Sequence, residues 1–376
     1  MKVAIVHDWL PYVGGAEYVI KAMLELFPDA DVYTSVYNKE KVGDFLGDVK
    51  VYTSFIDKLP LARKRHQIYL NLMPLAFEQF DLRGYDVVIS SSTCCAKAVI
   101  TDAQTPHICY CNTPMRYAWD LYFEYLDECK NPIKKAAVAL VMHRARKWDV
   151  LTSNRVDYFI ANSHNVARRI YKHYRRQSHV IYPPVDTSPG INTPYSQGDY
   201  YLVLSRLVPY KRIDVAVEAF NELVKPLVIA GDGPEMDKLR KMAKPNIRFM
   251  GRVSEEEKYE LYRGCKAFLF PGEEDFGITP VEAQSFGKPV IALGRGGALE
   301  TVIDGQTGVH YSEGNAKGLI EAVKRAETID FNPDVIKQNA LKFDWEMFKK
   351  QLKQFVEDKV EKGIGYPGSG TGLGRD

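Results

Sequence analysis

The sequence predicts an α/β protein made of two doubly wound, parallel-sheet domains in tandem. Short apolar segments rich in β-branched residues recur along the chain and alternate with helical stretches, as in parallel sheets that are buried on both faces. The first repeat is a strand at 2–7, a glycine-containing loop at 11–15 and a helix at 16–26. A chain of 376 residues is also too long for one ordinary core and suits two.

The expected strands fall into two series. In the N-terminal series they lie at 2–7, 85–90, 107–110 and 158–161. The adjacent prolines Pro183 and Pro184 suppress helix and favour an extended linker. In the C-terminal series the strands lie at 201–205, 227–230, 247–250, 267–270 and 289–293. We therefore expect one domain over 1–183, a second over 184–343, an amphipathic helix at 344–360 and a disordered glycine-rich tail at 363–376.

Composition excludes several classes of protein. Hydrophobic residues make up 45% and charged residues 26%, and the net charge is +2, so the chain is globular and is not a polycation that binds nucleic acid. The six cysteines lack the paired spacing of a zinc site, and we expect buried, reduced thiols. The N-terminal segment has no secretory pattern, and no apolar run is long enough to span a bilayer. A cytoplasmic location is expected.

Two carboxylates flank the start of a predicted helix in the C-terminal half. The strand at 267–270 is followed by a loop with Glu274, and Gly277 then opens a helix that carries Glu282. Glycine lets a ligand approach the backbone, and the unpaired N–H groups of a helix start favour a phosphate. Carboxylates accept hydrogen bonds from the hydroxyls of a sugar or ribose. The spacing alone is equally consistent with acidic residues that solvate a loop.

Two cations follow the strand at 201–205. Arg206 and Lys211 stand at its carboxyl end, the edge at which open α/β sheets bind ligands. A lone Arg or Lys on a loop is usually only solvated. Together with the paired carboxylates and the helix start, these cations suit a sugar diphosphate. Gly14 and Gly15, after the first strand, would let the phosphates approach the N-terminal domain.

These segments resemble the retaining glycosyltransferases of family 4, which have the GT-B fold of two Rossmann-like domains facing across a cleft. Glu274 and Glu282 match the E-x7-E pattern of that family. The resemblance is carried by Arg206 and Lys211, GDGP at 231–234, GRV at 251–253, PGEEDFGITPVEAQSFGKPVIA at 271–292 and GGALETVIDGQTG at 296–308. The N-terminal segments MKVAIVHDWL, YDVVISSS and HICYCNTPMRYAWD resemble the WbaZ-type mannosyltransferases of surface polysaccharide and lipopolysaccharide biosynthesis.

The resemblance implies a role for each matched residue. Arg206 and Lys211 would bind the donor diphosphate, Glu282 the ribose hydroxyls and Glu274 the donor sugar. Related sequences have a histidine where this chain has Asn112, which keeps hydrogen-bonding capacity but cannot carry a positive charge. We expect Asn112 to act in catalysis with Arg206, Lys211 and Glu274. The remaining donor contacts would come from Gly14, Gly15, Gly251, Arg252, Val253, Phe276, Gly277 and Ile278.

The implied activity is retaining transfer of a hexose, mannose from GDP-mannose, to a saccharide acceptor that in this class is often linked to a polyprenyl diphosphate. No resident cofactor is expected, and the cations would replace a metal ion. The helix at 344–360 would pack back onto the N-terminal domain. Two basic, apolar stretches, 58–77 and 134–148, have the composition of interfacial helices and would contact the inner leaflet, although packed helices with a solvated basic face fit the same pattern.

Other functions remain open at this point. The same fold serves UDP-sugar-dependent glycosyltransferases and sugar-nucleotide epimerases. It also serves phosphorylases, but one that uses pyridoxal phosphate would need a much longer chain than this one. A subunit that binds a nucleotide sugar without turning it over is supported only by Asn112.

Overall fold

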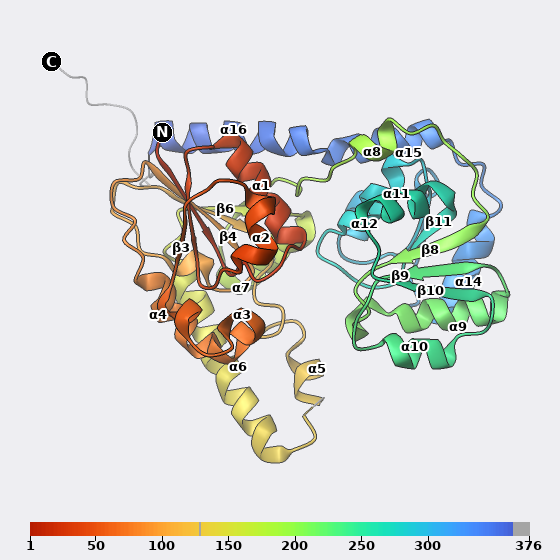
Figure 1. Ribbon diagram of the computed structural model, residues 1–376, viewed down its shortest axis with the longest axis horizontal. Coiled ribbons are helices and arrows are strands. Elements are labelled where there is room, and N and C mark those ends of the chain that lie inside the picture. Colours follow the sequence, from red (N-terminus) through yellow and green to blue (C-terminus); the bar gives the residue numbers. More distant parts are fainter. Residues whose placement is uncertain (128, 364–376) are drawn as a thin grey trace. The chain divides into compact units, whose positions relative to one another are not determined.

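The chain folds into two compact units, shown in Figure 1. The computed structural model describes residues 1–127 and 129–363. Unit 1 contains Met1–Ile181 and the segment that begins at Lys349, and unit 2 contains Tyr182–Phe348. The helix α16 (Trp345–Lys362) therefore starts in unit 2 and continues in unit 1. The tail at 363–376 was predicted to be disordered. Apart from Gly363, it lies outside the described residues.

Unit 1 is built on a parallel sheet of seven strands in the order β3-β2-β1-β4-β5-β6-β7. The strands are β1 (Val3–His7), β2 (Asp31–Thr34), β3 (Val51–Thr53), β4 (Val87–Ser92), β5 (His107–Cys111), β6 (Tyr158–Ala161) and β7 (Ser178–Val180). The α-helices are α1 (Gly15–Leu26), α2 (Lys39–Leu46), α3 (Ala62–Arg65), α4 (Met73–Glu78), α5 (Tyr122–Asp127), α6 (Pro132–Ser153) and α7 (His164–Tyr174). Short 3-10 helices are η1 (Phe55–Lys58), η2 (His66–Leu72) and η3 (Ala96–Ala98).

Unit 2 is built on a parallel sheet of six strands in the order β10-β9-β8-β11-β12-β13. The strands are β8 (Tyr200–Leu204), β9 (Leu227–Ala230), β10 (Ile247–Gly251), β11 (Cys265–Phe270), β12 (Val290–Leu293) and β13 (Gly308–Tyr311). The helices are α8 (Ser188–Ile191), η4 (Pro209–Lys211), α9 (Ile213–Leu223), α10 (Met236–Met242), α11 (Glu255–Gly264), α12 (Ile278–Ser285), α13 (Ala298–Thr301), α14 (Ala316–Ala326), α15 (Pro333–Ala340) and η5 (Leu341–Phe343).

Both sheets reverse their strand order near the middle. The reversal lies between β1 and β4 in unit 1 and between β8 and β11 in unit 2, and every pair of neighbouring strands is parallel. This order is that of a doubly wound α/β fold, in which ligands bind beside the carboxyl ends of the strands at the reversal. The predicted fold class is therefore confirmed.

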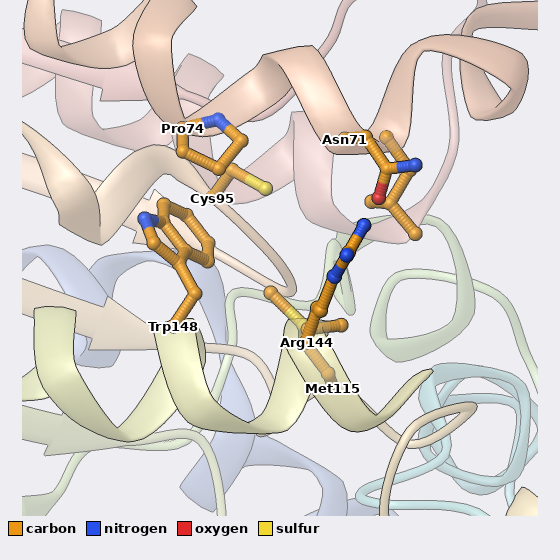
Figure 2. Close-up of a pocket in the computed structure, with 8 residues that line it drawn as sticks. Asn71, Pro74, Cys95, Met115, Arg144 and Trp148 are labelled. Carbon is orange, nitrogen blue, oxygen red and sulfur yellow. The ribbon is translucent and has the colours of Figure 1, made fainter. Parts of the chain in front are cut away.

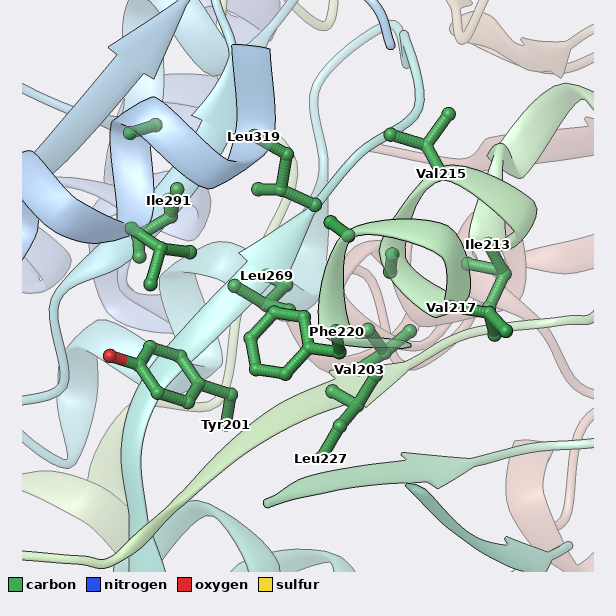
Figure 3. Close-up of a cluster of buried hydrophobic side chains, with 14 of the residues drawn as sticks. Tyr201, Val203, Ile213, Val215, Val217, Phe220, Leu227, Leu269, Ile291 and Leu319 are labelled. Carbon is green, nitrogen blue, oxygen red and sulfur yellow. The ribbon is translucent and has the colours of Figure 1, made fainter. Parts of the chain in front are cut away.

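The core of unit 2 fixes the strands that border its reversal point. Figure 3 shows Val203 of β8, Leu269 of β11 and Phe220 of α9 packed together. The Phe220 ring also lies edge-on to Tyr201, with ring centroids 5.0 Å apart. Burial of one such side chain contributes about 1.5–3 kcal/mol, so β8 and β11 form a firm base for the loops that follow them.

Four strands were absent from the sequence-based prediction. They are β2, β3, β7 and β13, each of three or four residues. Each of these strands contains polar residues and lacks the continuous apolar run that predicted β9 at the same length. In addition, β3 and β7 lie at the sheet edges, where their residues are largely not buried. Tertiary pairing rather than local pattern therefore selects these strands.

A buried ion pair joins η3 to α6 in unit 1. Lys97 and Asp149 are 2% and 0% exposed in their side chains, and Lys97 Nζ donates to the Asp149 carboxylate. Trp119 Nε1 donates to the same carboxylate at 2.8 Å, and the Tyr174 hydroxyl donates at 3.0 Å. Burial by itself would lower the pKa of Lys97, but Asp149 outweighs burial and raises it. The Asp149 carboxylate of α6 thus bonds to side chains from η3, from the segment with Trp119 and from α7.

Acid should destabilise unit 1 through His107, which is fully buried in β5. Burial lowers the pKa of His107 to about 4 from 6.5, so the folded protein holds it neutral while the unfolded chain gains a proton below pH 6.5. Stability is therefore lost as the pH falls from 6.5 towards 4, by about 2 kcal/mol at pH 5. Urea unfolding at pH 7 and pH 5 measures this loss.

The matched variants are His107→Gln and His143→Gln, because His143 is exposed on α6. His107→Gln should remove about 2 kcal/mol of the difference between the two pH values, and His143→Gln should leave it unchanged. An equal pH dependence in both variants would show that His107 does not carry the effect.

Candidate active site

A small pocket lies at the point in unit 2 where the strand order reverses. Lys211 of η4 and Glu274 of the loop after β11 form an ion pair there, with side chains 12% and 23% exposed. Two groups that the sequence analysis assigned to the donor site are therefore brought together at the carboxyl edge of the sheet. The pocket is lined by Val203, Leu204, Ser205, Lys211, Ile213, Leu269, Phe270, Pro271, Gly272 and Glu274.

Tyr210 links the two cations of this site. Arg206 is exposed, and its Nη2 donates to the Tyr210 hydroxyl at 2.8 Å. Lys211 Nζ lies 5.5 Å from the centroid of the Tyr210 ring, within the range of a cation–π contact. Sequence reasoning missed Tyr210, although its position between the two cations was a visible signal. Tyr210 therefore contacts Arg206 through its hydroxyl and Lys211 through its ring, at the carboxyl edge of the sheet.

Close backbone approaches hold the surrounding loops in place. Gly231 has φ +129°, and a Cβ atom there would lie 1.8 Å from the Ser205 carbonyl oxygen. Gly296 has φ +57°, and its Cβ atom would lie 2.3 Å from the Glu274 carbonyl oxygen. Gly297 N–H donates to that same oxygen at 2.8 Å. Only glycine fits these positions. The segments GDG at 231–233 and GRGG at 294–297 therefore place the loops that carry Arg206 and Glu274.

Glu282 lies on α12, as predicted, but its carboxylate has protein partners. It accepts hydrogen bonds from the Tyr262 hydroxyl at 2.8 Å and from Lys258 Nζ at 3.1 Å. Burial tends to lower the pKa of Lys258, and the carboxylates of Glu282 and Glu255 more than reverse this and raise it. Glu282 does not line the pocket that holds Lys211 and Glu274. Sequence reasoning missed both partners, which lie on α11.

The segment from Phe276 to Ile278, at the start of α12, would contact a ligand through its backbone rather than its side chains. Phe276 is buried, and its ring packs against Tyr182 and Phe343 at centroid distances of 5.6 and 5.4 Å. Ile278 packs against the same cluster. Gly277, with φ +91°, precedes the first residue of the helix. The side chain of Phe276 is thus held in the interior, and the N–H groups at the start of α12 are the donors that this segment can offer to a ligand.

The predicted base-pocket segment follows β10. Gly251 has φ +71°, and its carbonyl oxygen accepts a hydrogen bond from Gly231 N–H at 2.7 Å. Arg252 is exposed and Val253 is partly buried. The hydrogen bond ties this segment to the loop after β9, next to the loop that carries Arg206.

A second polar cluster lies at the reversal point of unit 1. Gly14 N–H donates to Glu17 Oε2 at 2.8 Å, and Glu17 Oε1 lies 3.4 Å from His7 Nε2. Nδ1 of His7 lies 3.1 Å from the Ser91 carbonyl oxygen. Burial lowers the pKa of His7, but Glu17 outweighs it and the pKa is raised. Gly14, which caps the start of α1, is thus held by a buried His–Glu pair, and Gly15 follows it as the first residue of the helix.

Asn112 belongs to this cluster. Its Nδ2 donates to Ser91 Oγ at 3.0 Å, and its backbone carbonyl oxygen accepts from Asn162 Nδ2 at 2.8 Å. Ser91 therefore connects Asn112 with His7. Neither His7 nor Glu17 was among the residues predicted for the site. The only available signal was the polar end of a buried strand followed by Glu17 in the first helical turn.

Asp8 shapes the loop that follows β4. It is 1% exposed, and its carboxylate accepts hydrogen bonds from four successive backbone N–H groups at 2.5–2.9 Å. The carboxylate thus meets the donor groups that would otherwise be unpaired at the start of η3. The donors belong to Thr93, Cys94, Cys95 and Ala96.

The described residues contain neither a cluster of metal-ligating side chains nor a membrane-spanning helix. Within 1–127 and 129–363, no group of three or more His, Cys, Asp or Glu side chains is arranged to hold a metal ion. In the same part of the chain, no helix has both the length and the apolar composition needed to cross a membrane.

Comparison with known families decides the class of this site. The family model for Glycosyltransferase Family 4 matches residues 13–189, and the family model for Glycosyl transferases group 1 matches residues 185–343. The chain belongs to the glycosyltransferases. The second match contains the pocket with Lys211 and Glu274, and the first contains Gly14, Gly15 and Asn112.

Relatives over the full length agree with this class. The glycosyltransferase is 23% identical over 377 residues to an uncharacterized glycosyltransferase of Methanocaldococcus jannaschii, with 95% of this chain and 98% of the relative covered. It is also 23% identical to the alpha-1,3/1,6-mannosyltransferase ALG2 of Candida glabrata, with 96% and 93% covered.

Solved structures show the same GT-B fold. HepE of Anabaena in complex with UDP-glucose has a TM-score of 0.68 and 18% identity, with 96% of this chain and 100% of that chain covered. The lipopolysaccharide outer core galactosyltransferase WaaB has a TM-score of 0.67 and 17% identity, with 95% and 99% covered.

Proposed function

We propose that this glycosyltransferase moves mannose from GDP-mannose to a saccharide acceptor with retention of configuration. The observation that carries the proposal is the pairing of Lys211 with Glu274 beside Arg206 at the reversal point of unit 2. The mannosyl donor is supported by relatives that are mannosyltransferases, such as ALG2 of Saccharomyces cerevisiae, which is 24% identical over 96% of this chain.

In the proposed reaction, the bond from the anomeric carbon to the diphosphate breaks through an oxocarbenium-like state. An acceptor hydroxyl attacks the anomeric carbon from the same face, and its proton passes to an oxygen of the leaving diphosphate, so the configuration is retained. Negative charge then develops on the leaving diphosphate, and the cations of Lys211 and Arg206 stabilise it. Because these fixed charges supply that stabilisation, we propose that turnover needs no metal ion. The carboxylate of Glu274 would exchange its bond with Lys211 for hydroxyl groups of the sugar, and it holds Lys211 in place until the donor arrives.

The remaining site residues have matching roles in this proposal. The N–H groups at Gly277 and Ile278 would meet the phosphates at the start of α12. Glu282 would accept ribose hydroxyls through the lone pairs that Tyr262 and Lys258 leave open. Asn112 and the backbone at Gly14 and Gly15, in unit 1, would contact the donor sugar and the phosphates. The segment with Gly251, Arg252 and Val253 would meet the base.

A thermal-shift screen followed by a transfer assay tests the donor. GDP-mannose at 100 times its Kd should stabilise the native protein by about 2.7 kcal/mol, and UDP-glucose should not. Transfer of mannose should then proceed at the same rate in excess EDTA. Stabilisation by UDP-glucose alone would make the protein a UDP-sugar-dependent enzyme, and conversion of that sugar without an acceptor would make it an epimerase. Binding without transfer to any acceptor would favour a non-catalytic subunit.

We further propose that the acceptor is lipid-linked and that unit 1 contacts an anionic membrane surface. The stretch at 58–77 runs from the last residue of η1 through α3 and η2 into α4, and the stretch at 134–148 lies within α6. Large apolar side chains are exposed on both stretches, at Leu61, Ile68, Leu72, Leu75 and Leu140. Three of the cations have protein partners: Arg63 pairs with Asp57, Lys135 pairs with Asp127, and Arg146 donates to the Ala118 carbonyl.

Vesicle co-sedimentation tests this contact. Lys64, Arg65 and Lys147 are exposed and have no ion pair within the described residues, and each contributes about 1 kcal/mol near an anionic surface. The triple change to glutamine should lower the bound fraction on anionic vesicles several-fold, and high salt should lower it for the unaltered protein. The matched control replaces Lys238, Arg240 and Lys241 of α10. Equal binding of both triple variants would contradict the assignment.

A further inference from the structure

A cavity of about 240 Å³ lies in unit 1 between α6 and the segment formed by η2 and α4. Figure 2 shows Pro74, Cys95 and Trp148 on one side of the cavity and Asn71 and Arg144 on the other. The lining is mainly apolar. It consists of Leu70, Asn71, Pro74, Cys95, Met115, Arg144, Ala145 and Trp148.

The side chains of Arg144 and Asn71, which line this cavity, lack partners among the described residues. Arg144 is exposed, and it makes no hydrogen bond or ion pair within 1–127 and 129–363. Figure 2 shows its guanidinium extending towards Asn71, whose amide is also without a partner in that part of the chain. The Trp148 Nε1 atom is buried without an acceptor among the described residues, and Figure 2 shows it on the edge of the indole ring that faces away from Arg144. The cavity therefore offers hydrogen-bond donors and one positive charge that the protein itself does not use.

The indole ring of Trp148 packs against a buried ion pair behind the cavity. Lys97 Nζ lies 5.8 Å from the centroid of the indole ring, and its charge is neutralised by Asp149. Arg144 is then the only cation that lines the cavity as described. A ligand that satisfies this cavity has an apolar body and a single anionic group with free acceptor atoms.

The size of the cavity and the residues around it define the apolar part of the ligand. An apolar cavity of about 150 Å³ holds a benzene ring, so 240 Å³ holds a chain segment of more than six carbons. Leu72 and Leu75 flank the cavity on the η2–α4 segment and are 39% and 52% exposed. A longer chain would therefore continue along exposed apolar side chains rather than into water.

We propose that this cavity binds the phosphate-proximal carbons of a single-chain lipid phosphate, with the phosphate on Arg144 and Asn71. This inference rests on the proposed function, because it places the lipid part of a lipid-linked acceptor in unit 1. The apolar chain excludes water from the cavity, and the guanidinium meets the phosphate in a bidentate pair.

The test measures binding of decyl phosphate to the full chain by isothermal titration, below the concentration at which the ligand aggregates. Ala145→Phe fills the cavity and should weaken binding at least tenfold. Ala136→Phe, at an exposed position of the same helix, should not. Arg144→Gln should weaken binding of decyl phosphate about tenfold and leave decanol unaffected, whereas Lys147→Gln should change neither. Inorganic phosphate alone should bind at least tenfold more weakly than decyl phosphate.

Equal affinity of the Ala145→Phe and Ala136→Phe proteins for decyl phosphate would overturn the proposal, as would equal affinity for decyl phosphate and inorganic phosphate. Ala145→Leu, a smaller change, provides the same comparison if the phenylalanine variant does not fold. Binding is measured without turnover, so it can be read even if the protein proves not to be a transferase. Conversely, transfer to a soluble acceptor without a lipid chain should be unaffected by Ala145→Phe, whatever the outcome of the titration.

Discussion

Replacing Lys211 by alanine is expected to lower the rate of sugar transfer by about 10²–10³, and replacing Arg206 should have an effect of the same order. Both changes remove a fixed positive charge from the place where the leaving diphosphate becomes negative. The side chain of Lys211 is 12% exposed in a pocket at the carboxyl ends of β8 and β11. Steady-state kinetics with GDP-mannose should show the loss mainly in kcat, because the charge being stabilised develops during the reaction.

The matched control is Lys238→Ala. Lys238 is exposed in the same unit and pairs with Glu235, so its loss removes a surface ion pair without touching the pocket. Melting temperatures of all three variants should stay close to that of the unaltered protein, since none of these cations belongs to the hydrophobic core. Near-normal turnover in both the Lys211 and the Arg206 variants would show that the donor diphosphate binds elsewhere.

Replacing Asp149 by alanine should lower the free energy of unfolding by about 3–5 kcal/mol, the range for breaking a buried ion pair. The substitution leaves Lys97, whose side chain is 2% exposed, without its counter-ion. It also removes the acceptor for Trp119 Nε1 and the Tyr174 hydroxyl. Urea denaturation monitored by circular dichroism measures the change.

The double variant Lys97→Met, Asp149→Leu separates charge from packing. With both charges absent, no ion is left buried and unpaired, so this protein should be more stable than Asp149→Ala alone. An Asp149→Ala protein that loses less than about 1 kcal/mol would mean that Lys97 reaches water or another partner when Asp149 is absent. Asp157→Ala, which removes a carboxylate whose hydrogen bond in the described part of the chain comes from His107 N–H, is a control of the same chemical type.

Local sequence was sufficient for much of the fold. The buried strands β1, β4, β5, β8, β9 and β11 lie close to their predicted positions, because each is a short apolar run bordered by loop residues. The start of α12 was also predictable, since Gly277 interrupts the chain just before the helix. Both features depend on residues within a few positions of one another. The expectation of cations at a strand end and of Glu274 after the next strand came from the same local patterns.

The tertiary structure alone decided which of these groups meet. Lys211 pairs with Glu274 because the reversal of strand order places β8 beside β11, and no local pattern encodes that neighbourhood. Glu282 is held by Tyr262 and Lys258 because α12 packs near α11.

The same reason applies in unit 1. His7 and Asn112 share Ser91 because β4 lies between β1 and β5. Lys97 and Asp149 are 52 residues apart and form an ion pair in the interior. A charged residue is tolerated there only when a distant partner neutralises it. The sequence by itself thus determined the longer, apolar elements, whereas long-range packing determined the short strands β2, β3, β7 and β13 and which charges are buried together.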